Sequence, residues 1–65
     1  MRLRVGDAVV LRTGDGPRMV IEEIADDGTV TVAWFEQRTD GSWGAMEVDF
    51  MSLDVLIKAP AVGSL

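Results

Sequence analysis

The stretch TVTVAWFE, residues 29–36, decides the fold because it is the clearest β-strand in the chain. Its β-branched and aromatic side chains suit the pleated, half-buried surface of a sheet. Successive side chains of a strand point to opposite faces, so this strand has two faces of different composition. Val30, Val32 and Trp34 lie on one face, and Thr29, Thr31, Ala33 and Phe35 lie on the other. We expect the first of these faces to meet the core.

A hairpin turn precedes this strand and joins it to another strand. Residues 25–28 end in Asp-Gly, whose residues tolerate the positive φ that a tight hairpin turn requires. Residues 18–24 form the preceding strand, but Ile24 is out of phase with the apolar residues before it. One extra residue restores the phase, so we predict a β-bulge at Glu22-Glu23.

The first strand is predicted over residues 8–12. It follows a turn at Gly6-Asp7 and ends at the cluster of turn residues 13–17, where glycines supply positive φ and proline fixes φ. Alternation places Val9 and Leu11 on the core face of this strand.

Residues after the central strand predict two further strands and one helical turn. A polar loop leads to a strand over 43–48, and residues 54–58 form a last short strand. Between them, Phe50 and Leu53 have the i, i+3 spacing of one helical face, which predicts a helical turn over 49–53 that Asp49 could cap. Residues 59–65 are predicted to be a flexible tail.

Five short antiparallel strands with a bulge and a late helical turn are typical of a small SH3-like barrel. We therefore predict a mostly β fold with a single barrel domain over residues 1–58. An OB-fold suits the chain less well, because it usually needs more residues and a longer helix. The predicted core consists of Val9, Leu11, Met19, Ile21, Val30, Val32, Trp34, Phe50 and Leu53.

Four stretches in this order resemble the YodC-like family of small bacterial proteins. Residues 14–19, GDGPRM, are similar to its Gly-Gly-Pro-x-Met element, and residues 5–11 to its opening. Residues 28–35 resemble its glycine, strand and Trp-aromatic pair, and residues 50–53 its late Phe and Leu. The opening also looks like the first strand of KOW and Tudor-type barrels. The resemblance implies a barrel fold over about residues 5–58 and no particular activity.

The residue inventory argues against catalysis. The chain has no His and no Cys, so the common general base, the thiol nucleophile and the usual zinc ligands are missing. The adjacent acids Glu22-Glu23 would point to opposite faces of a strand. The glycine turn at residues 14–16 is too short for a phosphate-binding loop, and no helix follows it. We predict a protein that is not an enzyme and holds no metal or cofactor.

Charge is unevenly distributed along the chain. The net charge is -5, and residues 1–18 hold four arginines against two acids, whereas residues 19–65 hold two basic residues against nine acids. This overall field repels nucleic acid and anionic membranes. The longest apolar runs have four residues, far below the roughly 20 of a membrane helix. We expect a soluble cytoplasmic protein without a signal peptide.

Two aromatic residues are the best candidates for contact with another molecule. Phe35 lies on the face opposite the core, and Trp43 follows a polar loop. Together they could form the aromatic patch that SH3-like domains use for ligands, or they could simply close a thin core. The predicted interaction surface consists of Phe35, Trp43, Val10, Arg12 and Arg18.

These features support three functional hypotheses. The first is a non-catalytic binding module of a bacterial or phage assembly, with a protein as its partner. The second is a small acidic inhibitor that mimics the charge of nucleic acid, as phage anti-defence proteins do. The third is a weak KOW-like nucleic-acid-binding domain. A homodimer is an alternative to a foreign partner, because Val10 and Phe35 both need a second buried surface.

Overall fold

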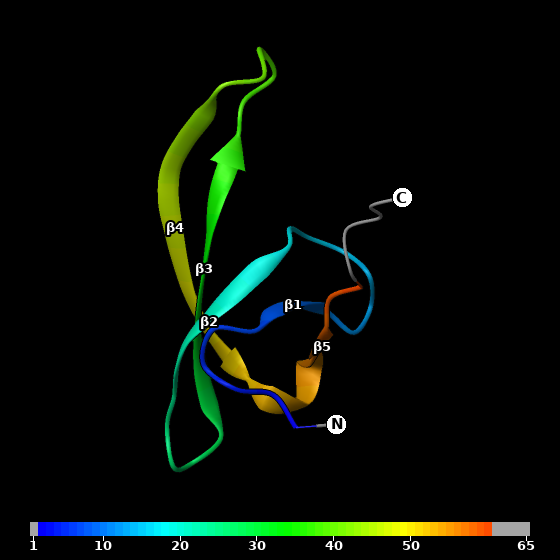
Figure 1. The fold of residues 1–65 in the computed structure, drawn as a ribbon, viewed down its shortest axis with the longest axis vertical. Coiled ribbons are helices and arrows are strands. Elements are labelled where there is room, and N and C mark those ends of the chain that lie inside the picture. The colour runs from blue at the N-terminus through cyan, green and yellow to red at the C-terminus, as the bar shows by residue number, and fades with distance from the viewer. Residues whose placement is uncertain (1, 61–65) are drawn as a thin grey trace.

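The five strands of the protein form one antiparallel sheet in the computed structural model, which describes residues 2–60 (Figure 1). A 3-10 helix, η1, connects the last two strands. The strands follow one another across the sheet in the order β4-β3-β2-β1-β5. The elements are β1 (Ala8–Leu11), β2 (Met19–Ile24), β3 (Thr29–Gln37), β4 (Trp43–Ser52), η1 (Leu53–Val55) and β5 (Leu56–Lys58).

This arrangement confirms the prediction of a mostly β, five-stranded SH3-like fold with one late helical turn. The last strand pairs with the first, so that Val10 lies opposite Ile57 and Leu11 opposite Leu56. The pairing continues past β5, where the Ala59 N–H donates to the Ala8 carbonyl at 2.8 Å. Because the last strand pairs with the first, the sheet curls and encloses a core although the chain is short. The predicted tail begins at residue 59, and its residues 61–65 lie outside the described residues.

The position of the helical turn differs from the prediction over 49–53. β4 continues to Ser52, and the turn follows as η1. Ser52 caps it, because its hydroxyl accepts a hydrogen bond from the Asp54 N–H at 3.3 Å. Asp49 does not cap a turn, since it lies in β4 opposite Val32. Pairing with the long β3 extends β4 through the residues whose local spacing indicated a helix.

The predicted bulge in β2 is present. The register between β2 and β3 shifts after Ile21, which pairs with Val32, so that Glu23 pairs with Thr31. The extra residue returns Ile24 to the inner face, where it packs against the core. The following turn reverses the chain at Gly28, whose φ of 90° favours glycine.

The core lies on the inner face of the curled sheet. Six buried side chains form it: Val9, Met19, Ile21, Val30, Val32 and Leu56. Six partly buried apolar side chains pack against these: Leu3, Leu11, Ile24, Trp34, Met51 and Leu53. Of the predicted core residues, Phe50 is misplaced, since its side chain is 68% exposed. The reason is register: Met51 pairs with the buried Val30, which turns its neighbour Phe50 outward beside Thr31.

Candidate interaction surface

The β3–β4 hairpin extends beyond the rest of the sheet as an arm (Figure 1). β2 pairs with β3 from Val30 to Ala33, whereas β4 pairs with β3 from Thr29 to Gln37. We call residues 34–47 the hairpin arm. Within the described chain it is a two-stranded ribbon, and the side chains of residues 35–43 are all exposed. Beyond Trp34, which packs against the core, the arm therefore presents surface that the core does not use.

The tip of the arm is held by a compact set of hydrogen bonds. The Arg38 N–H donates to the Ser42 carbonyl at 2.8 Å, and the Gly41 N–H donates to the Arg38 carbonyl at 2.9 Å. The Asp40 carboxylate accepts from both the hydroxyl and the N–H of Ser42, at 2.6 and 2.9 Å. The Ser42 hydroxyl, followed by its N–H, lowers the pKa of Asp40 below its ordinary value of 3.8. The tip is thus built to hold one shape.

Acid is expected to loosen both hairpin turns. The Thr29 N–H donates to the Asp27 carboxylate at 2.9 Å and lowers the pKa of that group too. A carboxyl whose pKa is depressed by folding stabilises the fold above its unfolded pKa, and that stabilisation is lost as pH falls through the folded value. NMR titration should place the pKa values of Asp27 and Asp40 below 3.8. Values at or above 3.8 would show that these carboxylates do not hold the turns.

The outward face of β2, β3 and β4 carries a group of large apolar side chains. Residues directly opposite one another in an antiparallel pair share a face. Ala33 thus shares the outward face with Val20 and Val48, and Phe35 shares it with Met46. We call this group the outer apolar face; its large members, between 41% and 68% exposed, are Val20, Phe35, Trp43, Met46, Val48 and Phe50.

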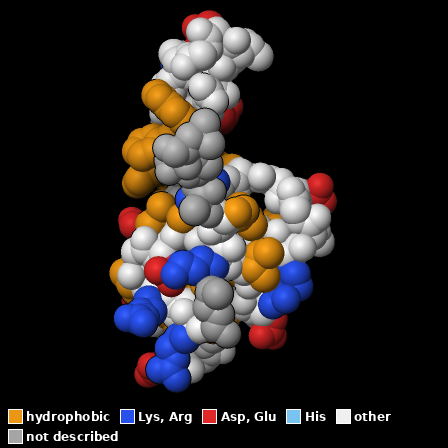
Figure 2. Space-filling model, turned by 45° about the vertical axis from the view of Figure 1, so that its right-hand side comes forward, with side chains coloured by type: hydrophobic (Ala, Val, Ile, Leu, Met, Phe, Trp, Pro, Cys, Tyr) orange, Lys and Arg blue, Asp and Glu red, His pale blue; other side chains and the backbone are white. Residues whose placement is uncertain are grey.

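A second irregularity in register keeps the arm's aromatic residues together. The β3–β4 pairing shifts after Phe35, so that Gln37 pairs with Trp43. Phe35 and Trp43 consequently line one shallow apolar groove. An adjoining groove adds Arg18, Val20 and Met46 to these two residues. Figure 2 shows hydrophobic side chains gathered along the side of the molecule below the tip of the arm.

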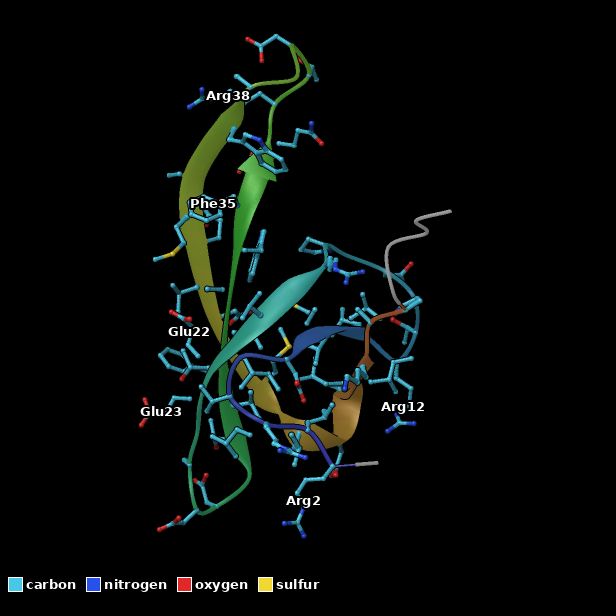
Figure 3. The ribbon with its side chains drawn as sticks, viewed as in Figure 1. Arg2, Arg12, Glu22, Glu23, Phe35 and Arg38 are labelled. Carbon is cyan, nitrogen blue, oxygen red and sulfur yellow. The ribbon has the colours of Figure 1, made fainter. Side chains whose placement is uncertain are left out.

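The structure separates the five residues that the sequence proposed as one surface. Phe35, Trp43 and Arg18 line the same groove. Val10 pairs with Ile57 where β1 meets β5. Strand β2 separates β1 from β3, the strand that carries Phe35. Arg12 lies on the opposite side of the molecule from Phe35 (Figure 3). It donates from Nε to the Asp54 carbonyl at 3.1 Å.

Sequence reasoning missed four members of the outer apolar face: Val20, Met46, Val48 and Phe50. A signal for three of them was present. Met46, Val48 and Phe50 alternate with Glu47 and Asp49, which is the pattern of a strand with one apolar and one acidic face. Ending the predicted strand at Val48 concealed this pattern. Val20 carried no such signal, because both faces of β2 contain apolar residues.

The described part of the chain offers little else that could carry chemistry. Residues 2–60 contain no group of three or more acids placed to share a metal ion. None of the helical segments in that range is long and apolar enough to cross a membrane. The buried side-chain polar atoms of the same residues all have hydrogen-bond partners. The outer apolar face is therefore the feature of this fold that most needs a functional explanation.

Comparison with known proteins leaves the outer apolar face as the main guide to function. No family model, curated protein or solved structure matches the chain. The similarity of residues 5–58 to YodC-like proteins thus remains a prediction from the sequence.

Proposed function

We propose that the protein is a non-catalytic binding module that contacts another protein chain through its outer apolar face. The observation that carries this proposal is the gathering of six large, substantially exposed apolar side chains on one side of a small sheet. Soluble monomers rarely expose continuous apolar patches larger than a few hundred Å². Covering this surface would release the water that it orders, which is the main driving force of protein association.

The composition of the face also suits binding. Phe35 and Trp43 lie side by side in a shallow groove, and Met46 lies across from Phe35 in the sheet. Aromatic residues and methionine are enriched in the centres of protein interfaces, and tryptophan is a frequent energetic anchor. The paired strands of the arm hold these side chains in place, so binding would cost little backbone entropy.

The two other hypotheses have weaker support. Nucleic-acid binding is opposed by the net charge of -5 of the chain, and the Arg12 and Arg18 guanidiniums each donate one hydrogen bond to a backbone carbonyl, that of Asp54 and that of Pro60. A mimic of nucleic-acid charge needs a regular array of carboxylates. The carboxylates of Asp27 and Asp40 instead accept hydrogen bonds within their own turns. Both hypotheses remain predictions that binding measurements can test.

A capture experiment tests the proposed function. An immobilised chain is exposed to a bacterial lysate that also contains untagged copies of the same chain, so that either kind of partner can be recovered. Phe35→Glu places a charge at the centre of the outer apolar face and is expected to reduce capture roughly tenfold or more. Thr39→Glu adds the same charge at the exposed tip and is expected to retain capture. Equal capture by both variants, or none by the wild type, would contradict the proposal.

A further inference from the structure

We propose that an extended segment of another protein, in which apolar and basic residues alternate, adds to the free edge of β4 as a further strand of the sheet. This inference rests on the proposed function and names the chemistry of the partner. Three observations carry it: the length and exposure of the edge, the direction of its backbone groups, and the two kinds of side chain that lie along it.

Strand β4 is a long edge strand. It has ten residues, pairs with β3 on one side, and is the last strand of the sheet on the other (Figure 1). Natural proteins usually protect such an edge with a short strand, lysines, prolines or a covering segment. β4 contains no lysine and no proline, and its residues from Ala45 to Phe50 are all exposed. The edge is therefore open to another strand.

The backbone groups at this edge belong to residues of the outer apolar face. The Leu53 N–H donates to the Gly28 carbonyl at 3.0 Å, which marks a hydrogen-bonded pair at the base of the β3–β4 hairpin. Hydrogen-bonded and non-hydrogen-bonded pairs alternate along an antiparallel pair of strands. In the β3–β4 register, Met46, Val48 and Phe50 therefore belong to non-hydrogen-bonded pairs. Their N–H and C=O groups point away from β3, toward the position of an added strand.

The Phe50 N–H shows this direction directly. It donates to the Asp49 carboxylate at 2.8 Å and not to β3. The carboxylate thus shields one donor of the edge. An added strand can bond to Met46 and Val48 at once, and it reaches the Phe50 N–H when the carboxylate turns toward a basic side chain of the partner.

The side chains along the edge form an apolar row and an acidic row. Met46, Val48 and Phe50 belong to the outer apolar face. Glu47 and Asp49 lie between them on the opposite face, where they pair with Trp34 and Val32. A residue of an added strand lies about 5 Å from the β4 residue directly opposite and shares its face. Apolar side chains of the partner therefore suit the first row, and basic side chains suit the second.

The acidic row also disfavours a second copy at this edge. If two β4 edges pair with their apolar rows on the same face, Glu47 and Asp49 of the two copies meet on the other face. Like charges directly opposite one another destabilise a sheet. The arm as a whole is acidic too, because it holds Glu36, Asp40 and Glu47 against Arg38 as its one basic residue. The charge of the edge thus favours a basic partner.

A peptide in which lysine alternates with valine tests the charge pattern. Fluorescence anisotropy is expected to show that the wild type binds it roughly tenfold or more tightly than the matched peptide of glutamate and valine. Glu47→Lys/Asp49→Lys is expected to reverse this preference. Asp15→Lys/Asp26→Lys makes the same change in net charge in two exposed turns outside β4 and is expected to keep the preference. Loss of the preference in both variants would show an effect of net charge alone and overturn the proposal.

Methylation of the peptide backbone tests the addition of a strand. Only every second residue of an added strand turns its N–H toward β4: the valines if the strand is antiparallel, and the lysines if it is parallel. Methylating the N–H groups of that set is expected to weaken binding roughly tenfold or more, whereas methylating the other set is expected to leave binding unchanged. Equal effects of the two sets would show that the peptide does not join the sheet, which overturns the proposal.

The outcomes separate this inference from the proposed function. A wild type that captures a protein through Phe35 but does not prefer the lysine peptide overturns the added strand and leaves the binding module standing. A wild type that does neither overturns both. A wild-type dimer in sedimentation equilibrium that Val48→Pro dissociates shows that a second copy occupies the edge, which also overturns the proposal. Circular dichroism of every variant verifies that the fold is intact.

Discussion

Replacing Ile21 by alanine is expected to lower the free energy of unfolding by about 2–5 kcal/mol. Ile21 is completely buried, lies in β2 opposite Val32 and belongs to the cluster of six core side chains. Its truncation removes apolar contacts and leaves a cavity in a core with few other members. At the usual stability per residue, the whole chain is stable by only about 3–10 kcal/mol. Urea denaturation, monitored by tryptophan fluorescence, should show a large fall in the urea concentration at the unfolding midpoint, or no folded baseline at all.

Ile57→Ala is the matched control for this change. It removes the same atoms from a strand of the same sheet, but Ile57 is 39% exposed and lies in the edge strand β5. We expect a loss of about 1 kcal/mol or less, because little buried area is lost and the site stays open to water. Equal losses at the two positions would contradict the inward direction of Ile21 and the location of the core.

The central hairpin could be predicted from the sequence because local and long-range preferences agree there. The alternation in residues 29–36 and the Asp-Gly before it favour the same strand and the same turn that the structure contains. The bulge in β2 was equally predictable, because Ile24 has to reach the core and regular alternation would turn it outward. Where one face of a strand must be buried, register follows from the pattern of apolar residues.

The secondary structure around Phe50 could not be predicted from local patterns in this way. Phe50 and Leu53 have helical spacing, while Met46, Val48 and Phe50 have strand spacing, and the two patterns share Phe50. Pairing with β3, whose residues are distant in sequence, decides in favour of the strand. This preference arises from tertiary contacts, which local periodicity does not contain.

The outer apolar face was only partly predictable for a related reason. Its aromatic pair depends on the register shift after Phe35, which keeps Trp43 on the outward face. One local feature accompanies the shift. A Cβ at Gly44 would lie 3.2 Å from the Glu36 carbonyl oxygen, so glycine permits a close approach of the two strands there. An isolated glycine in a predicted strand suggests such an irregularity, but it does not show to which face the neighbouring side chains turn.

Glutamate substitutions at Met51 and Phe50 are expected to have opposite consequences. Met51 pairs with the buried Val30 and packs against the core, so Met51→Glu removes that packing and brings a carboxylate against apolar side chains. We expect a loss of about 2–4 kcal/mol in the free energy of unfolding. Phe50→Glu changes a side chain that is 68% exposed and should cost about 1 kcal/mol or less. Urea denaturation at low micromolar concentration measures both values.

These neighbouring residues test the register of β4 and the use of its outward face together. A one-residue slip would exchange the two positions, so a larger loss at Phe50 than at Met51 would show that β4 pairs differently with β3. In the register of this structure, Phe50→Glu leaves the chain folded but removes an apolar side chain from the outer apolar face. It should therefore weaken the capture of a partner chain by the outer apolar face while scarcely changing stability. Loss of stability without loss of capture would instead place Phe50 in the core and exclude it from the interface.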